Sequence, residues 1–260
     1  RTRGVIIVEP EDGPLASGRQ GQGRLADEQR ILAAVHTAVH PRRDWSGRKV
    51  LISAGPTQEA IDPVRFISNR SSGKMGYALA EAARARGAEV VLVSGPTTLP
   101  SPAGIEYCPV TTAEEMQKAL TQRFAWSDTV IMAAAVADFR PAKPSAHKIK
   151  KRRGPLTQLE LEATDDILRE LGERRTNQVL VGFAAETEDL LAHAREKLHA
   201  KGVDLLVAND VTAAGSGFGS DTNRVVLLTR EGAPEELPLL PKREVADRIL
   251  DRILTVQTGR

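Results

Sequence analysis

The chain has 260 residues, which is enough for one large domain or two small ones. Hydrophobic residues make up 41% and charged residues 27%, values typical of a globular protein in water, which argues against a disordered, fibrous or membrane-embedded chain. The formal net charge of +2 and the 3% of aromatic residues argue against binding to duplex or single-stranded nucleic acid. The single cysteine, Cys108, excludes an intrachain disulfide and a multi-cysteine metal site, and we expect a reducing, cytoplasmic location.

The sequence changes character near residue 44. Residues 9–24 are rich in glycine and polar residues, and residues 41–44 have the composition of a linker. Beyond them, apolar runs predict buried strands at 50–54, 90–93, 129–133, 179–183 and 203–207. Helical patterns occupy residues 78–86, 113–124, 166–174 and 187–200. This alternation predicts an α/β fold: a doubly wound, mostly parallel, Rossmann-like sheet with helices on both faces.

Small or polar residues follow several of the predicted strands. They occur at residues 53–57, 134–138, 184–187 and 208–210. Each run alone is equally consistent with tight strand-to-helix packing, but ligands of doubly wound sheets bind beyond the carboxyl ends of the strands, so four such runs favour a ligand cleft. Asp138 fits a metal or ribose ligand as well as a turn or helix-capping residue.

Residues 69–76 combine hydroxyl groups, glycines and Lys74 just before a helix that we expect to begin at Tyr77. Phosphate binding is the physical expectation for such a helix start. The segment is not a Walker A loop, because Ser68 stands where glycine is required and Met75 where serine or threonine is required. A nicotinamide oxidoreductase would share the fold, but the chain lacks the G-x-G-x-x-G fingerprint, and Tyr77 and Tyr107 lack a lysine four residues on.

Three further features carry charge or glycine. The basic run at 148–153 is either a solvated loop or a flexible cover for a polyphosphate. Lys197 and Lys201 lie on one helix face, a spacing that is also common among surface lysines. The glycine-rich residues 215–223 are a candidate mobile lid.

Several motifs resemble, in order and spacing, the bacterial phosphopantothenoylcysteine synthetase family. They lie at residues 53–57, 62–69, 71–76, 134–138, 148–151, 182–187 and 208–210, so that the resemblance runs from about residue 49 to the last helix. It implies a ligase that uses CTP, with Mg²⁺, to activate the carboxylate of 4'-phosphopantothenate as an acyl-cytidylate. L-cysteine then displaces CMP to form the amide. It also implies a homodimer in which a loop after a strand reaches the other subunit.

The resemblance assigns roles to individual residues. Asn69 and Lys148 correspond to catalytic positions, Arg65 and Asn69 to substrate or intermediate binding, and Asp138 to a metal ligand. The implied nucleotide-binding residues are Ser72, Gly73, Lys74, Ala134, Ala135, Asp138, Lys148, Asp165, Asp166, Ile167, Leu168, Phe183, Lys197 and Lys201. The chain carries Thr-Asp-Asp-Ile at 164–167 where the family commonly has Asn-Pro-Asp-Ile, a change that backbone contacts would survive.

Residues 1–43 resemble the closing segment of the flavin-dependent decarboxylase that many bacteria fuse ahead of the synthetase. Residues 44–260 then form the ligase domain, and FMN is expected only in the missing decarboxylase part. Many decarboxylases have cysteine where this chain has Ser17, which puts a proton-donor role at that position in doubt. The rival hypothesis is a non-catalytic nucleotide-binding or assembly module.

Overall fold

The computed structural model describes residues 7–14, 18, 20–28, 31–32, 35, 42–150, 158–186, 190–210, 215–217 and 219–258. The chain divides into two compact units, Arg1–Trp45 and Ser46–Arg260. In the first unit, β1 (Glu11–Pro14) pairs antiparallel with β2 (Gln20–Arg24). Ser17 lies outside the described residues, and the assignment of this unit to a decarboxylase stays a prediction.

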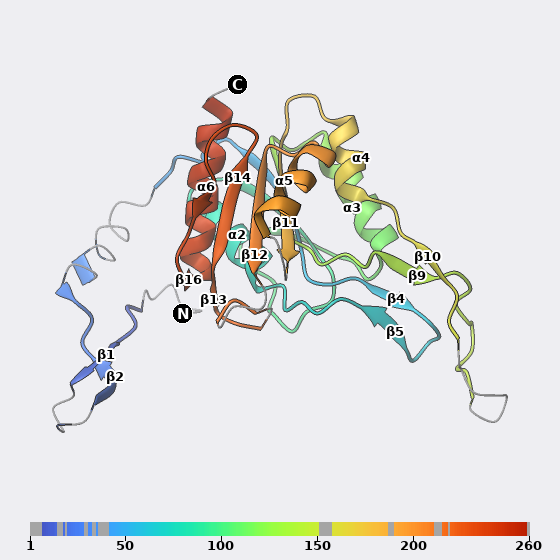
Figure 1. The fold of residues 1–260 in the computed structure, drawn as a ribbon, viewed down its shortest axis with the longest axis horizontal. Coiled ribbons are helices and arrows are strands. Elements are labelled where there is room, and N and C mark those ends of the chain that lie inside the picture. The colour runs from blue at the N-terminus through green and yellow to red at the C-terminus, as the bar shows by residue number, and fades with distance from the viewer. Residues whose placement is uncertain are drawn as a thin grey trace. The chain divides into compact units, whose positions relative to one another are not determined.

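The second unit is built on an eight-stranded sheet in the order β15-β14-β12-β11-β8-β3-β6-β7 (Figure 1). The bounds of its strands are β3 (Lys49–Ala54), β6 (Glu89–Ser94), β7 (Glu106–Pro109), β8 (Thr129–Met132), β11 (Val179–Glu186), β12 (Leu205–Asp210), β14 (Val225–Thr229) and β15 (Glu235–Glu236). The six strands from β12 to β7 are parallel, whereas β14 and β15 are antiparallel to their neighbours. The chain runs from β3 outward to β6 and β7, and then returns to β8 on the other side of β3. The strand order therefore reverses between β3 and β8, where a doubly wound sheet opens a crevice for a ligand.

Helices cover both faces of this sheet. The helices are α2 (Lys74–Ala85), α3 (Ala113–Phe124), α4 (Ile167–Arg174), α5 (Leu190–Ala200) and α6 (Lys242–Thr258). One hydrophobic cluster joins α3, α4 and α5 to strand residues such as Leu51 and Val130, while α2 and α6 pack together over the opposite face. The strands are apolar on both faces because both are covered. The predicted fold class is confirmed.

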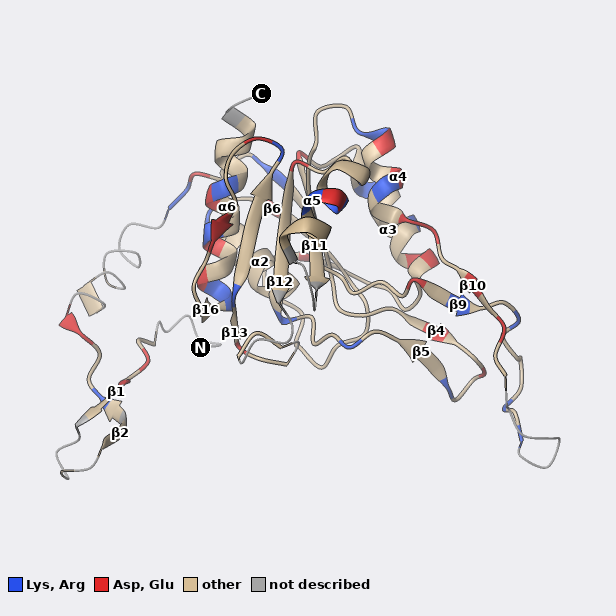
Figure 2. Cartoon of the chain, viewed as in Figure 1, with Lys and Arg blue, Asp and Glu red and all other residues tan. Residues whose placement is uncertain are grey.

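Short two-stranded ribbons surround the sheet. They pair β4 (Gln58–Ala60) with β5 (Phe66–Ser68), β9 (Phe139–Pro141) with β10 (Leu161–Ala163), and β13 (Thr222–Asn223) with β16 (Leu240–Pro241). The first two ribbons extend together beyond one end of the sheet (Figure 1). Figure 2 shows acidic and basic residues interspersed along α3, α4 and α6. Within the described ranges, no helix is long and apolar enough to cross a membrane.

Most predicted elements occur, with shifted ends. The helix expected at 78–86 begins at Lys74, so the expectation that residues up to Gly76 precede it was wrong. The cause is Gly73, which occupies the N-cap position with φ of 75° and turns the chain directly into the helix. The strand expected at 179–183 extends to Glu186, because its last residues pair with β12 up to Asp210. Thr187 and the two residues after it lie outside the described residues.

Candidate functional site

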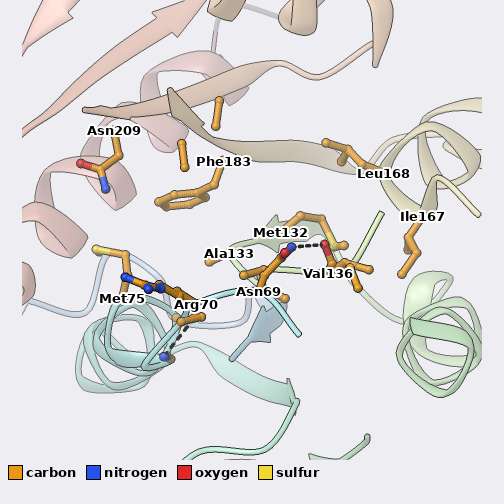
Figure 3. A pocket seen from close by; sticks show the side chains of 18 of the residues that line it. Asn69, Arg70, Met75, Met132, Ala133, Val136, Ile167, Leu168, Phe183 and Asn209 are labelled. Atoms are coloured by element: carbon orange, nitrogen blue, oxygen red, sulfur yellow. Dashed lines mark hydrogen bonds between the residues drawn. The ribbon is translucent and has the colours of Figure 1, made fainter. Parts of the chain in front are cut away.

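A cavity of about 770 Å³ opens at the carboxyl edge of the sheet, where the strand order reverses. Its walls come from the start of α2, the segment after β8, the start of α4, the end of β11 and the end of α5. In Figure 3, Asn69 projects between Arg70 and Met75 on one side and Ile167 and Leu168 on the other. Sequence segments as far apart as residues 69 and 242 therefore meet in one cavity.

Close backbone approaches bring the start of α2 to the end of β3. A Cβ atom at Gly76 would lie 2.5 Å from the Cβ of Ala54 and 3.0 Å from the carbonyl oxygen of Ser53. A Cβ atom at Gly95 would lie 1.7 Å from the carbonyl oxygen of Pro56. A side chain at either position would force the neighbouring backbone to move, so these two glycines allow the loops after β3 and β6 and the first turn of α2 to share one small volume.

The first turn of α2 has the features of an anion-binding site. Gly73 at the N-cap has no side chain to accept a hydrogen bond from the turn, and no acidic residue lies in that turn. Ser72, Gly73 and Lys74, which are predicted to bind nucleotide, all line the cavity. The positive end of the helix dipole and the Lys74 ammonium group both favour a negatively charged ligand here.

The segment after β8 forms the floor of the cavity, and a set of hydrogen bonds holds it in an extended form. The Ala135 N–H donates to the carbonyl oxygen of Gly55 at 2.9 Å, and the Ala137 N–H donates to the hydroxyl oxygen of Thr57 at 2.9 Å. Asn69 Nδ2 donates to the carbonyl oxygen of Val136 at 2.8 Å (Figure 3). This bond turns the amide nitrogen of Asn69 toward Val136 and so fixes the orientation of the side chain. The amide oxygen of Asn69 faces away from Val136.

Asp138 follows this segment, lines the cavity and is exposed. Among the described residues, no group of three or more histidine, cysteine or carboxylate side chains is arranged to hold a metal by itself. Mg²⁺ in nucleotide sites is commonly held by one or two carboxylates together with substrate phosphates. One exposed carboxylate at the cavity wall fits that mode.

The opposite wall begins at α4. Asp166 caps this helix, accepting a hydrogen bond from the Arg169 N–H at 3.1 Å, and it also pairs with the Lys201 ammonium group. The helix predicted from Asp166 therefore begins at Ile167, because the Asp166 carboxylate occupies the cap. The predicted residues Asp165, Asp166, Ile167, Leu168, Phe183, Lys197 and Lys201 all line this wall.

Two predicted site residues, Arg65 and Lys148, do not line this cavity. Lys148 is exposed beyond β9, and the Arg65 guanidinium binds Asp62, with its Nη2 atom donating to the carbonyl oxygen of Ile149 at 2.9 Å. Lys151, Arg152 and Arg153 of the predicted basic cover lie outside the described residues. The cavity is thus lined by the residues predicted to bind nucleotide, except Lys148, and it does not include Arg65, which was predicted to bind substrate or intermediate.

A buried carboxylate organises the neighbourhood of Arg65 and Lys148. Asp62 accepts hydrogen bonds from the backbone N–H groups of Val64 and Arg65 at 2.9 Å each and of Ile149 at 3.1 Å. The hydrogen-bonded Arg65 guanidinium holds the pKa of Asp62 well below its usual range, and the backbone donors lower it further against the opposing effect of burial. Asp62 therefore ties the residue after Lys148 to the β4–β5 ribbon.

Sequence reasoning missed four lining residues whose side chains carry charge or amide groups: Arg70, Asn209, Asn223 and Lys242. Arg70 lies within residues 69–76 and Asn209 within the motif at 208–210, so proximity to Asn69 and to the end of β12 points to both. Asn223 ends the glycine-rich segment 215–223 that is predicted as a lid, whereas Lys242 has no such signal. Lys242 begins α6, far along the chain, and only the β13–β16 pairing brings it to the cavity.

The chain is similar in sequence to several known proteins. The family model for the DNA/pantothenate metabolism flavoprotein C-terminal domain matches residues 45–256. The "Coenzyme A biosynthesis bifunctional protein CoaBC" of Bacillus subtilis is 51% identical over 98% of this chain, which spans 64% of that protein's length. A "Cysteine/Cysteine sulfinic acid decarboxylase" from an unknown prokaryotic organism is 45% identical over 98% of this chain and 73% of that protein.

The chain is also similar to a solved structure. The crystal structure of the C-terminal domain of the coenzyme A biosynthesis bifunctional protein CoaBC is 44% identical, with a TM-score of 0.71, and the match covers 83% of this chain and 98% of that one. The resemblance predicted from the motifs is confirmed. The chain belongs to the family of the DNA/pantothenate metabolism flavoprotein C-terminal domain.

Proposed function

We propose that this chain is the phosphopantothenate–cysteine ligase of coenzyme A biosynthesis, using CTP and Mg²⁺. The observation that carries the proposal is one cavity in which Asn69 lies between the start of α2 and a wall formed by α4 and α5, whose lining residues are those predicted to bind nucleotide. The similarity to the C-terminal domain of CoaBC supports it. A cytoplasmic location belongs to the same proposal.

Activation is needed because a carboxylate is a poor electrophile at neutral pH. The carboxylate oxygen of 4'-phosphopantothenate attacks the α-phosphorus of CTP, the bond from that phosphorus to the bridging oxygen of the β-phosphate breaks, and pyrophosphate leaves. The amine of L-cysteine then attacks the acyl carbon of the cytidylate. The bond from this carbon to the CMP oxygen breaks, CMP leaves, the amine releases a proton to the solvent, and the amide forms.

The cavity residues have distinct parts in this scheme. Lys197 and Lys201 line the same cavity as residues 165–168 and bind nucleotide phosphates, and Ser72 to Lys74 bind negative charge from the other side. Asn69, held by Val136, donates to the acyl group or its intermediate. Asp138 would hold Mg²⁺, which when bound neutralises charge on the triphosphate.

Lys148 requires a second copy of the chain in this proposal. It lies outside the cavity of its own chain, on a loop near the β9–β10 ribbon that extends beyond the sheet. We propose a homodimer in which this loop delivers Lys148 to the partner's cavity, where its ammonium group stabilises the charge that develops on the triphosphate.

Mixing two inactive variants tests this arrangement. In a one-to-one mixture of Lys148→Gln and Asn69→Asp chains, a Lys148 that acts on the partner's cavity restores one intact site in each mixed dimer, about a quarter of wild-type turnover. No recovery after verified subunit exchange would show that Lys148 acts within its own chain.

Pyrophosphate release tests the activity itself. Release should require both CTP and 4'-phosphopantothenate, and strong release with ATP but none with CTP would refute the cytidine assignment. CTP binding without turnover at saturating substrates would instead favour a nucleotide-binding module. The relative named as a decarboxylase extends beyond this chain, which spans 73% of its length. Failure to bind NADPH would exclude the oxidoreductase alternative.

A further inference from the structure

The α2 side of the cavity holds a pair of lysines from distant parts of the sequence. Lys74 is the first residue of α2, and Lys242 is the first residue of α6. Both line the cavity, and Lys242 is only 7% exposed. Burying an ammonium group away from water is costly unless an anionic or polar partner receives it.

Three consecutive loop residues, Gly219, Ser220 and Asp221, accept hydrogen bonds from the two ammonium groups. Lys74 Nζ donates to the carbonyl oxygen of Gly219 at 2.8 Å and to Oδ1 of Asp221 at 2.7 Å. Lys242 Nζ donates to the carbonyl oxygen of Ser220. The backbone N–H of Lys242 donates to the carbonyl oxygen of Asp221 at 2.9 Å, which fixes the start of α6 against the same loop.

The charges on this side of the cavity are unbalanced. Of the described residues lining it, Arg70, Lys74 and Lys242 are cationic, whereas the lining carboxylates Asp138, Asp165 and Asp166 belong to the segments after β8 and before α4. Asp221 is the carboxylate that pairs with Lys74, and its side chain is 90% exposed. Burial lowers the pKa of Lys242, the nearby Lys74 lowers it further, and Asp221 opposes both effects.

The three oxygens of the loop match the acceptor pattern of a phosphoryl group. Gly219, Ser220 and Asp221 present two carbonyl oxygens and one carboxylate oxygen to two ammonium groups. A phosphoryl group presents three strong acceptor oxygens and carries more negative charge than Asp221 alone. Exchange of the loop oxygens for a phosphoryl group would keep both lysines paired and would balance their charge better.

We propose that Lys242, together with Lys74, binds a phosphoryl group of a substrate. In the ligand-free chain, the carboxylate of Asp221 takes the place of that phosphoryl group. The proposal rests on the proposed ligase function for the identity of the substrate. Two substrates carry this chemistry: CTP at its terminal phosphates and 4'-phosphopantothenate at its phosphate monoester. A phosphorylated substrate then displaces residues 219–221 from the two lysines.

Binding to the full chain, measured by calorimetry, tests the proposal. The probes are pyrophosphate, CTP, CMP, 4'-phosphopantothenate and pantothenate. Lys242→Gln removes one charge-assisted hydrogen bond, so we expect the affinity for pyrophosphate and for one of the two substrates to fall roughly 10- to 100-fold. A loss for CTP but not CMP identifies the terminal phosphates as the ligand, and a loss for 4'-phosphopantothenate alone identifies the monoester.

Three companion variants separate binding from folding. Lys242→Arg keeps the charge and should recover most of the affinity, with a melting temperature close to that of the wild type. Arg243→Gln, the control, changes the next residue of α6, which pairs with Asp247 and does not line the cavity, and should bind every probe normally. Asp221→Asn removes the competing carboxylate and should tighten pyrophosphate binding several-fold, whereas a loop that is only structural would give equal or weaker binding.

Two results would overturn the proposal: wild-type affinity of folded Lys242→Gln for every phosphate-bearing probe, or no binding of any such probe to the wild type. The ligase proposal fails separately. If the wild type releases no pyrophosphate from CTP and 4'-phosphopantothenate, but binds pyrophosphate in a Lys242-dependent manner, the phosphoryl site stands and the ligase assignment does not.

Discussion

Replacement of Gly76 by alanine tests how closely α2 must approach β3 to form the site. The added Cβ atom would lie 2.5 Å from the Cβ of Ala54, 3.1 Å from its Cα and 3.0 Å from the carbonyl oxygen of Ser53. Ordinary carbon contacts are near 3.5–4.0 Å. Two of these three neighbours are backbone atoms of a central strand, so α2 must move rather than a flexible side chain.

Two effects of opposite sign determine the change in stability. Overpacking in a well-packed region costs about 1–3 kcal/mol, whereas Gly→Ala inside a helix gains up to about 1 kcal/mol. We expect a net loss of about 1–2 kcal/mol in the free energy of unfolding, which lowers the melting temperature by about 2–8 °C for a domain of this size. Displacement of the first turn should also weaken CTP binding.

Calorimetric melting and CTP titration of Gly76→Ala measure both effects. The matched control is Ala78→Gly, which loses helix propensity in the same helix at a position that does not line the cavity. This control should melt lower but bind CTP normally. If Gly76→Ala melted higher than the wild type, helix propensity alone would explain the site, and the close approach would not constrain the sequence.

Three further substitutions probe Lys148 and Asn69, the residues proposed to be catalytic, and Asp62, which holds the segment next to Lys148. Lys148→Gln should reduce pyrophosphate release about 100-fold or more without changing the melting temperature, and near-normal release would exclude its role. Asn69→Asp should abolish product formation while CTP still binds. Asp62→Asn should melt below the wild type at pH 7. The pKa of Asp62 is lowered in the fold, so its carboxylate stabilises the fold only while it is ionised. The difference in melting temperature between this variant and the wild type should therefore shrink below about pH 4. A difference that stayed constant with pH would contradict this reasoning.

The sequence predicted the sheet because burial on both faces leaves a simple signal. Strands such as β3 and β6 are apolar at nearly every position, and parallel strands covered by helices need that composition. The two-stranded ribbons were harder to predict from the sequence. Strands β4, β5, β9 and β10 have three residues each, too few for any alternation to stand out.

The site was predictable where its residues lie within motifs at strand ends. Asp138 and Phe183 lie in the cavity because parallel strands bring their carboxyl ends to one edge, and Asn69 joins them from the segment between β5 and α2. Lys242 was not predictable, because its place depends on the pairing of β13 with β16, which have two residues each. Lys148 was named from the resemblance, and the fold of a single chain does not carry it into the cavity.

The distribution of charge along the cavity argues for two anionic ligand groups with a reacting centre between them. Lys74 and Lys242 lie on the α2 and α6 side, Lys197 and Lys201 on the α5 side, and Asn69 projects between the walls (Figure 3). A site for one compact anion would gather these cations at one point. Cations on two walls instead suit two phosphate-bearing substrates that must meet, and the neutral Asn69 amide suits a centre where a carboxylate becomes a mixed anhydride and then an amide. The roles of the two ends are therefore separable by experiment: substitution of Lys242 and of Lys197 should affect different phosphate groups.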